Sequence, residues 1–290
     1  MFIIFGLISM VVAILADYAL MVFLDVSFHS LNLWMIIPIG GGALGALCGL
    51  GIFLYLKKVN IKASAKHFIA SGLIAFIGFW AVNYFTYAST YIDNGNINNS
   101  FKGEHISNYM YNETEPFNFK NYLDFNFENS ESVIRYKGRS AGETVKFSKG
   151  FNKLSFYIEL LGFVIGGLAV GFEVLGDKAY CGKCKKYMLE KKLYEFTYSD
   201  WEEETLELQN ALQGTKEDFN EFINRERTKP GKAESYVKVT LTHCPSCKDA
   251  FITLKFMQAK KSLGGKISWE EDKQYNRKLE LNNELSSVIV

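Results

Sequence analysis

Four apolar segments, each about as long as a membrane span, constrain the fold of this chain more than any other feature. A helix needs about 20 predominantly apolar residues to cross the hydrocarbon of a bilayer. Backbone polar groups inside hydrocarbon must be satisfied within the protein, which favours helices. We therefore predict an all-α bundle of four transmembrane helices, at Phe2–Leu24, Leu33–Leu56, Phe68–Ala88 and Leu154–Leu175.

The distribution of lysine predicts how these helices are oriented. Four lysines lie in the connection between the second and third segments, and another group begins at Lys178 after the fourth segment. The connection between the first and second segments, residues 25–32, carries no Lys or Arg. Because positively charged loops stay in the cytoplasm, we expect both termini to be cytoplasmic. We expect an integral, multi-pass protein in the lipid bilayer of a bacterial inner membrane or a plasma membrane.

The first segment could be a retained helix or a cleaved signal peptide, and its residues help to distinguish the two. It lacks the basic start and the small-residue cleavage site of a signal peptide. We therefore expect a retained helix, with a cleaved signal as the alternative.

The predicted organisation is transmembrane helices 1 to 3 in 1–88, an extracytoplasmic cap in 89–153, helix 4 in 154–175, a cytoplasmic domain in 176–262 and a polar tail in 263–290.

The predicted cap is too long to be a plain connector, since loops above about 15 residues usually have structure or function of their own. Ser132–Tyr136 and Thr144–Phe147 resemble short strands. Three aromatic pairs upstream are spaced by two residues, which is compatible with extended chain. We expect a small cap of mixed structure, with the aromatic pairs at Tyr109 and Tyr111, Phe117 and Phe119, and Phe125 and Phe127.

Two CxxC motifs follow the fourth segment and carry the most specific chemistry in the sequence. They are Cys181-Gly-Lys-Cys184 and Cys244-Pro-Ser-Cys247. Two residues between the cysteines allow a tight turn to direct both sulfurs at one metal ion. Disulfides are disfavoured in the cytosol, so metal binding is the better interpretation there. The alternative is a redox dithiol, which normally has one CxxC near a βαβ pattern.

Residues around the motifs predict the architecture of the cytoplasmic domain. Alternating apolar residues predict strands over Met188–Tyr198, Tyr236–Leu241 and Ala250–Phe256. Asp200 can cap a helix over Trp201–Gln213, and Thr215 can open a second helix that runs to about Arg227. In the tail, Ser268 and Glu271 match a capping box, which predicts one more helix. The alternative is a loosely ordered polar tail.

With its four cysteines and flanking strands, the segment from Tyr180 to Phe256 resembles a zinc ribbon. The separation of 59 residues between Cys184 and Cys244 exceeds the usual 15–20, and the two predicted helices would account for it. The resemblance implies an α+β zinc-ribbon-like domain in which Cys181, Cys184, Cys244 and Cys247 hold a structural zinc. Four thiolates leave no open position for catalysis. His243 could replace one ligand, but a neighbouring surface histidine is the simpler interpretation.

Polar residues within the spans are the other candidates for function. Asp17, Asn83 and Glu159 lie at similar predicted depths near the outer ends of their helices. Carboxylates in hydrocarbon are costly, so they usually face a bundle interior or water. They would form a proton or cation site, or they would be interfacial residues that snorkel or pair, for example with Lys153.

Small residues recur at spacing four in two of the spans, which permits close approach of helix backbones. The candidates for helix packing are Gly41, Gly45 and Gly49 in the second span, and Gly162 and Gly166 in the fourth. Packing inside one bundle is the favoured interpretation, and assembly of a homo-oligomer or a sliding gate between helices are the alternatives. Pro38 is expected to bend the second helix locally.

Charge and motifs narrow the class of function. The chain has a formal net charge of +1, with 20 basic and 19 acidic residues after residue 175. This balance disfavours a large nucleic-acid interface, which needs a basic surface. No nucleophile elbow, Walker loop or HExxH motif is present, so we expect no enzyme. The leading hypothesis is a membrane-anchored binding or signalling protein whose ribbon docks a cytoplasmic protein partner; the alternative is a small transporter or channel.

Overall fold

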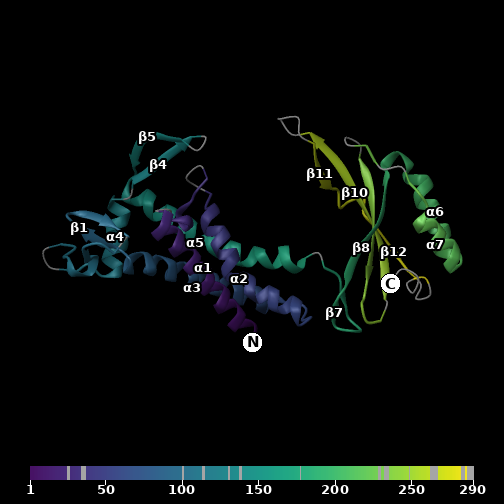
Figure 1. The fold of residues 1–290 in the computed structure, drawn as a ribbon, viewed down its shortest axis with the longest axis horizontal. Coiled ribbons are helices and arrows are strands. Elements are labelled where there is room, and N and C mark those ends of the chain that lie inside the picture. The colour runs from purple at the N-terminus through teal and green to yellow at the C-terminus, as the bar shows by residue number, and fades with distance from the viewer. Residues whose placement is uncertain are drawn as a thin grey trace. The chain divides into compact units, whose positions relative to one another are not determined.

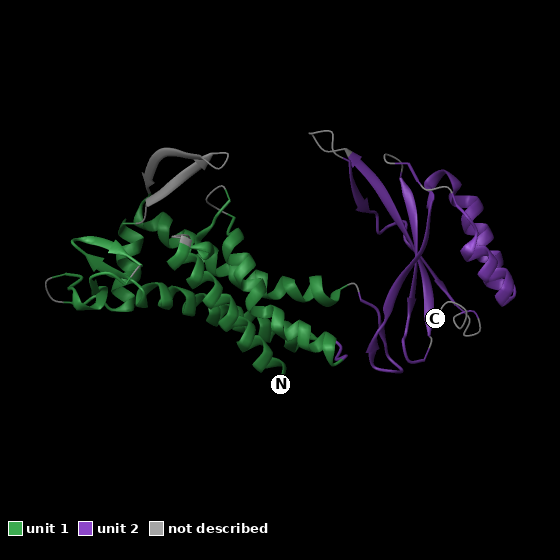
Figure 2. Cartoon of the chain, in the orientation of Figure 1, with its two compact units in different colours: residues 1–59, 63–177 green, residues 60–62, 178–290 purple. Residues whose placement is uncertain are grey.

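A computed structural model of the chain divides into two compact units (Figures 1 and 2). Unit 1 comprises Met1–Val59 and Ala63–Asp177, and unit 2 comprises Asn60–Lys62 and Lys178–Val290. The structure describes residues 1–290 except 25–26, 34–36, 100, 113–114, 130, 137–138, 177, 228–229, 232–234, 248, 262–266, 282–284 and 286–290, and except the side chains of 131–136, 139–146 and 261.

Unit 1 contains four helices that are long and apolar enough to cross a membrane, as predicted. Helix α1 has the predicted bounds, and α5 continues as a π-helical turn over Phe172–Gly176. Pro38 is the N-cap of α2 and does not bend it. The predicted start at Leu33 was therefore wrong: proline fixes φ and lacks an N–H, so it is favourable at a helix start. The helices are α1 Phe2–Leu24, α2 Ile39–Lys58, α3 Ala65–Ala88 and α5 Lys149–Gly171.

The glycines of α2 and α5 lie where elements of one chain meet. A Cβ added at Gly45 would lie 2.0 Å from the carbonyl oxygen of Phe163, and one at Gly166 would lie 2.0 Å from that of Gly42. Backbone therefore contacts backbone, which only glycine permits at these two positions. An added Cβ would meet another element within 3.2 Å at each predicted packing glycine, namely Gly41, Gly45, Gly49, Gly162 and Gly166.

Residues between α3 and α5 form a small part of unit 1 with mixed structure. They begin with a three-stranded antiparallel sheet of order β2-β1-β3 and end with the hairpin β4–β5, which confirms the two predicted strands. The aromatic pair at 125 and 127 lies in a helix, so extended chain was wrong there. The elements are β1 Tyr91–Asp93, β2 Asn96–Asn98, β3 Glu104–His105, α4 Phe119–Asn129, β4 Glu131–Tyr136 and β5 Arg139–Lys146.

Unit 2 is built on an antiparallel sheet with two helices packed on it (Figure 1). Strand β9 lies between β8 and β10, and side chains alternate between the helix-covered face and the opposite face. Buried residues such as Val239, Leu241, Ile252 and Phe219 form the core beneath the helices. The elements are β8 Leu189–Thr197, α6 Trp201–Gln213, α7 Lys216–Asn224, β9 Tyr236–His243 and β10 Ala250–Lys261.

The helix predicted in the tail was wrong, because this segment adds two strands to the sheet. Strand β11 (Ile267–Glu271) pairs with the second half of β10, and β12 (Arg277–Glu280) pairs with its first half. Ile267, Trp269 and Glu271 are half-buried while Ser268 and Glu270 are exposed. This alternation has the period of a strand, and pairing with the preceding strand β10 outweighs the capping signal.

Candidate metal centre and polar cavity

The four paired cysteines come together in unit 2 from two separate turns. Cys181 ends β6 (Tyr180–Cys181), and Cys184 lies in the turn that leads to β7 (Lys186–Tyr187). Cys244 follows β9, and Cys247 lies in the turn before β10. Antiparallel pairing of β8 with β9 places Leu189 opposite His243, so the two turns meet at one end of the sheet. The sheet therefore brings together cysteines that are distant in sequence.

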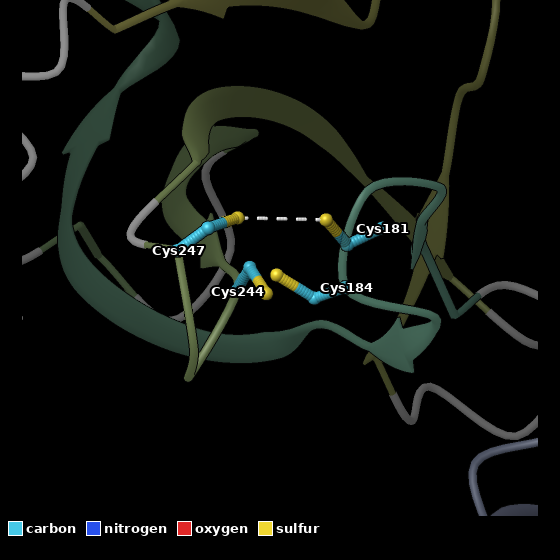
Figure 3. Close-up of side chains that lie close together, drawn as sticks. All are labelled: Cys181, Cys184, Cys244 and Cys247. Carbon is cyan, nitrogen blue, oxygen red and sulfur yellow. Dashed lines mark hydrogen bonds between the residues drawn. The ribbon is translucent and has the colours of Figure 1, made fainter.

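The geometry of the thiols fits a single metal ion. All four sulfur atoms lie within 4.8 Å of one another, and Figure 3 shows them directed at a common point. The Sγ atoms of Cys181 and Cys247 are 3.6 Å apart. Tetrahedral zinc with Zn–S bonds of about 2.3 Å places its sulfurs about 3.8 Å apart. All five cysteines of the chain are in the described part, and each is a free thiol.

The surroundings of the thiols make one of them easy to ionise. At Cys244, burial opposes ionisation, but backbone N–H groups of Cys247 and Ser246 and the adjacent thiols outweigh it and lower the pKa to about 7. At Cys184, the hydrogen bond with the Cys247 thiol and partial desolvation raise the pKa to about 12. The metal-free cluster therefore favours one thiolate that its neighbours stabilise. A bound cation would displace the remaining thiol protons, because metal binding needs thiolates.

Interactions between and within the two turns hold the cluster closed. The Lys186 Nζ of the first turn donates to the Ser246 Oγ of the second at 2.8 Å. Within the second turn, the backbone N–H of Cys244 donates to the Asp249 carbonyl. Met188 packs against Cys181 and Cys244 from within the protein. His243 ends β9 beside the cluster, but the metal-ligating group found among the described residues consists of the four cysteines alone.

A contact that the sequence did not predict links the first turn to residues 60–62 within unit 2. The Tyr180 hydroxyl donates to the Asn60 carbonyl at 3.1 Å, and the Tyr187 hydroxyl donates to the Ile61 carbonyl at 3.1 Å. The Tyr187 N–H donates to the Asn60 Oδ1 at 3.2 Å. Asn60 adopts a φ of 57°, a left-handed conformation that Asn tolerates better than most residues. The two tyrosines next to the first CxxC motif therefore position this segment.

In unit 1, the predicted intramembrane residues have specific partners. Asp17 is buried, and its carboxylate accepts from the backbone N–H of His29 at 3.1 Å and lies 2.9 Å from the His29 Nδ1. Glu159 accepts from the Asn32 Nδ2 at 3.0 Å. His29 and Asn32 belong to the connection between α1 and α2, and no pattern in the sequence indicated their role. Lys153, the suggested partner, lies 3.8 Å from Asp124 instead.

Asn83 and Glu159 line the same polar cavity, of about 440 Å³, whereas Asp17 does not line it. The cavity is in unit 1, at the end of the bundle where α1 and α3 end and α2 and α5 begin. Asp17 is related to it only through His29, which is one of its lining residues. The structure therefore brings two of the three predicted polar residues to one cavity. We call this site the polar cavity; its other lining residues include Ser30, Asn32, Thr86, Asn152 and Phe156.

A second hollow, of about 820 Å³, lies on unit 2 between β8, β11 and the segment after α7. Aromatic side chains contribute to its wall, with the Tyr236 and Trp269 rings 4.8 Å apart. Arg227 stacks on the Tyr194 ring at 3.7 Å and lies 3.3 Å from Glu204. We call this hollow the sheet groove.

Comparisons with known proteins give no relative. No family model, curated protein or solved structure matches the chain. The resemblance to a zinc ribbon therefore rests on the convergence of the cysteines and on the order of elements around them. That order has the predicted form: a CxxC turn, a strand, two helices, a strand, a second CxxC turn and a strand.

Proposed function

We propose that this chain is a multi-pass membrane protein with a cytoplasmic zinc-ribbon-like domain that docks a protein partner. Four helices of spanning length and apolarity support the membrane location. Lysines after α2 and after α5 support cytoplasmic termini by the positive-inside rule. A bacterial inner membrane or a plasma membrane fits this arrangement, and the proposed role is not enzymatic.

The convergence of four thiols on one point is the observation that carries this proposal. Zinc fits best, because it favours tetrahedral coordination by thiolates. With four protein ligands and no open position, the ion would be structural. It would fix the two turns to each other and so fix the ends of β8, β9 and β10. A sheet held in this way is suited to presenting a binding surface.

The sheet groove is the surface that we propose for the partner. Tyr, Trp and Arg are enriched in the energetically dominant parts of protein interfaces, and this groove contains all three. Its aromatic wall is held by the Tyr236–Trp269 contact, and its Arg227 is fixed by Glu204. Rigid side chains lose little conformational freedom on binding, so the groove is suited to recognising a protein segment.

Metal analysis of the full chain in detergent tests the zinc site. We expect about one zinc per chain in the parent protein, by the four-thiolate stoichiometry of such sites. Cys181→Ser and Cys244→Ser should each lose the metal. Cys48→Ala is the matched control, because Cys48 is buried in α2 and lies outside the cluster. A protein without metal, with oxidised thiol pairs, would instead support the dithiol alternative.

A binding comparison tests the docking role. A partner captured by the full chain should be lost with Trp269→Ala, which removes the groove wall. Tyr275→Ala is the control, because Tyr275 is an exposed aromatic residue of the same domain and does not line the groove. The docking role fails if the parent protein captures no partner, or if both variants behave alike.

A small transporter or channel is the second candidate function. The observation in its favour is that Asn83 and Glu159 line one polar cavity. This function predicts cation flux through the purified protein in liposomes, and loss of flux with Glu159→Gln. Absence of flux in the parent protein would reject it, without bearing on the zinc site.

A further inference from the structure

The polar cavity presents a carboxylate and several amide and hydroxyl oxygens that can accept hydrogen bonds. Asn32 is the clearest case. Its amide group donates to Glu159, and its Oδ1 is buried without a partner among the described residues. Leaving a buried polar atom without a hydrogen bond is unfavourable. Because Asn32 is a lining residue of the cavity, a ligand that draws its side chain outward can supply the missing donor.

Two further asparagines of the cavity follow the same pattern. The Asn83 Nδ2 donates to the Phe79 carbonyl in its own helix at 2.9 Å. The Asn152 Nδ2 donates to the Phe127 carbonyl at 2.9 Å. Each amide is therefore oriented by one donor bond to backbone, which leaves its oxygen as an acceptor beside its second N–H.

Two hydroxyl groups of the cavity wall are likewise oriented so that their oxygens are available as acceptors. Thr86 donates its hydroxyl hydrogen to the Val82 carbonyl at 3.0 Å, and Ser30 donates to the Ser27 carbonyl at 2.9 Å. A hydroxyl has one hydrogen, so these two oxygens can only accept from a ligand. Three amides and two hydroxyls thus offer oxygen lone pairs.

The formal charge at the cavity wall is negative. Glu159 is a carboxylate, and no Lys or Arg is found among the described lining residues. Asp17 bonds twice to His29, so it adds no unpartnered carboxylate to the wall. The nearby Lys153 lies against Asp124 and the Phe127 ring. His29 also lines the cavity, but its Nδ1 is engaged by Asp17. A buried carboxylate is stabilised by a cationic partner, and a cationic ligand would supply that charge directly at Glu159.

Size and aromatic content distinguish an organic cation from a bare metal ion. At about 440 Å³ the cavity is much larger than a bare ion requires, and the rings of Tyr122, Phe127 and Phe156 contribute to its wall. Aromatic faces attract organic cations. We propose that the polar cavity is a binding site for a small organic cation that carries a primary ammonium group. Its three N–H donors match the oxygens of Glu159, Asn32 and Asn83.

This inference goes beyond the docking role and needs no zinc. It deepens the transport candidate by naming a ligand class, but it concerns equilibrium binding and not passage across the membrane. Binding is therefore measured on the full chain in detergent, where flux plays no part. A protein that binds the cation but shows no flux would retain this inference and lose the transport function.

The experiment is calorimetric titration with a series of primary ammonium ions from methylammonium to phenethylammonium, each beside its neutral hydroxyl isostere. We expect saturable binding of at least one ammonium ion and none of its isostere. Glu159→Gln should weaken binding at least tenfold. Glu173→Gln is the matched control, since this exposed glutamate follows α5 and does not line the cavity; it should bind as the parent does.

Asn83→Ala provides a second variant in case Glu159→Gln does not fold. Its amide bonds only to its own helix among the described contacts, so removing it should preserve the fold and weaken binding severalfold. Three results would overturn the proposal: no ammonium ion binds, the isostere binds equally, or Glu159→Gln binds as tightly as the parent. Competitive Glu159-dependent binding of Na⁺, K⁺ or Ca²⁺ in place of the amine would also overturn it, in favour of an inorganic cation.

Discussion

Replacement of Gly45 by alanine tests whether the glycines of α2 and α5 pack inside one bundle. The added methyl carbon would lie 2.0 Å from the carbonyl oxygen of Phe163 and 2.6 Å from its Cα. Ordinary non-bonded carbon contacts are about 3.5–4.0 Å, so the two backbones must separate by roughly 1.5 Å. Backbone atoms cannot rotate away as a side chain can, so the strain spreads along the α2–α5 contact.

Overpacking of this kind costs about 1–3 kcal/mol. Alanine is also a better helix former than glycine by about 1 kcal/mol in water, which partly offsets the cost. Gly42→Ala corrects for this difference in helix propensity, because it also replaces a glycine of α2 by alanine. A Cβ at Gly42 meets only the Gly162 carbonyl oxygen at 3.8 Å, an ordinary contact. The difference between the two variants therefore isolates the steric term.

The assay is thermal unfolding of the full chain in detergent, followed by helical circular dichroism. A large domain shifts in Tm by about 2–4 °C per kcal/mol, so Gly45→Ala should unfold about 2–12 °C below Gly42→Ala. Equal unfolding temperatures would refute the close α2–α5 contact. A change in oligomeric state without loss of monomer stability would instead favour the interpretation that this glycine surface serves assembly between chains.

Three other predictions concern unit 2. Glu204→Gln should destabilise α6 by about 2 kcal/mol in hydrogen exchange, because buried Glu204 lies 2.6 Å from Arg225 and 3.3 Å from Arg227; exposed Glu203→Gln should not. Zinc chelation and Tyr187→Phe should both increase amide hydrogen exchange at Asn60 and Ile61, because Tyr187 links the first CxxC turn to these residues. Unchanged exchange would mean that this turn does not hold residues 60 and 61 in place. The Thr215 N–H and hydroxyl lower the pKa of Asp218 below its ordinary 3.8, so Asp218→Asn should destabilise α7 at pH 7. The difference in stability between variant and parent should disappear as the pH falls below 3.8 and Asp218 becomes protonated in the parent. A difference that stays constant with pH would contradict this dependence on the Asp218 charge.

Elements with strong local signals were predictable from the sequence. Apolar length alone located the four long helices, because hydrocarbon thickness sets that length. Asp200 and Gly214 gave the bounds of α6 correctly. Between α3 and α5, however, the spacing of the aromatic residues favoured extended chain where the structure has the helix α4. The Asn118 side chain accepts from the Asn121 N–H, which is a helix-capping signal, and it would have been the better guide.

Elements that depend on pairing between strands were not predictable in this way. Ile267, Trp269 and Glu271 alternate over only five residues, which is too short to outweigh the apparent capping box at Ser268. Pairing with β10 decides the outcome, although β10 is the preceding strand and its Lys261 pairs with Ile267, because a local capping pattern does not report strand pairing. The cysteine cluster was predictable although its two halves are distant in sequence. Each CxxC motif supplies two ligands, and a tetrahedral metal site needs four, so the presence of two motifs indicates that they come together.

Asp17 and Glu159 occupy similar positions in the sequence pattern of their helices, but the structure separates them. Both oxygens of Asp17 are engaged by His29, so Asp17 anchors the connection between α1 and α2. Glu159 receives a single amide donor from Asn32 and lines the polar cavity, so it retains capacity for a ligand. Asp17→Asn should therefore lower stability and loosen the α1–α2 connection, since a charge-assisted hydrogen bond contributes about 1.5–3 kcal/mol. Glu159→Gln should instead spare the fold and weaken ligand binding; if both variants acted on binding alone, Asp17 would belong to the ligand site and its pairing with His29 would not be structural.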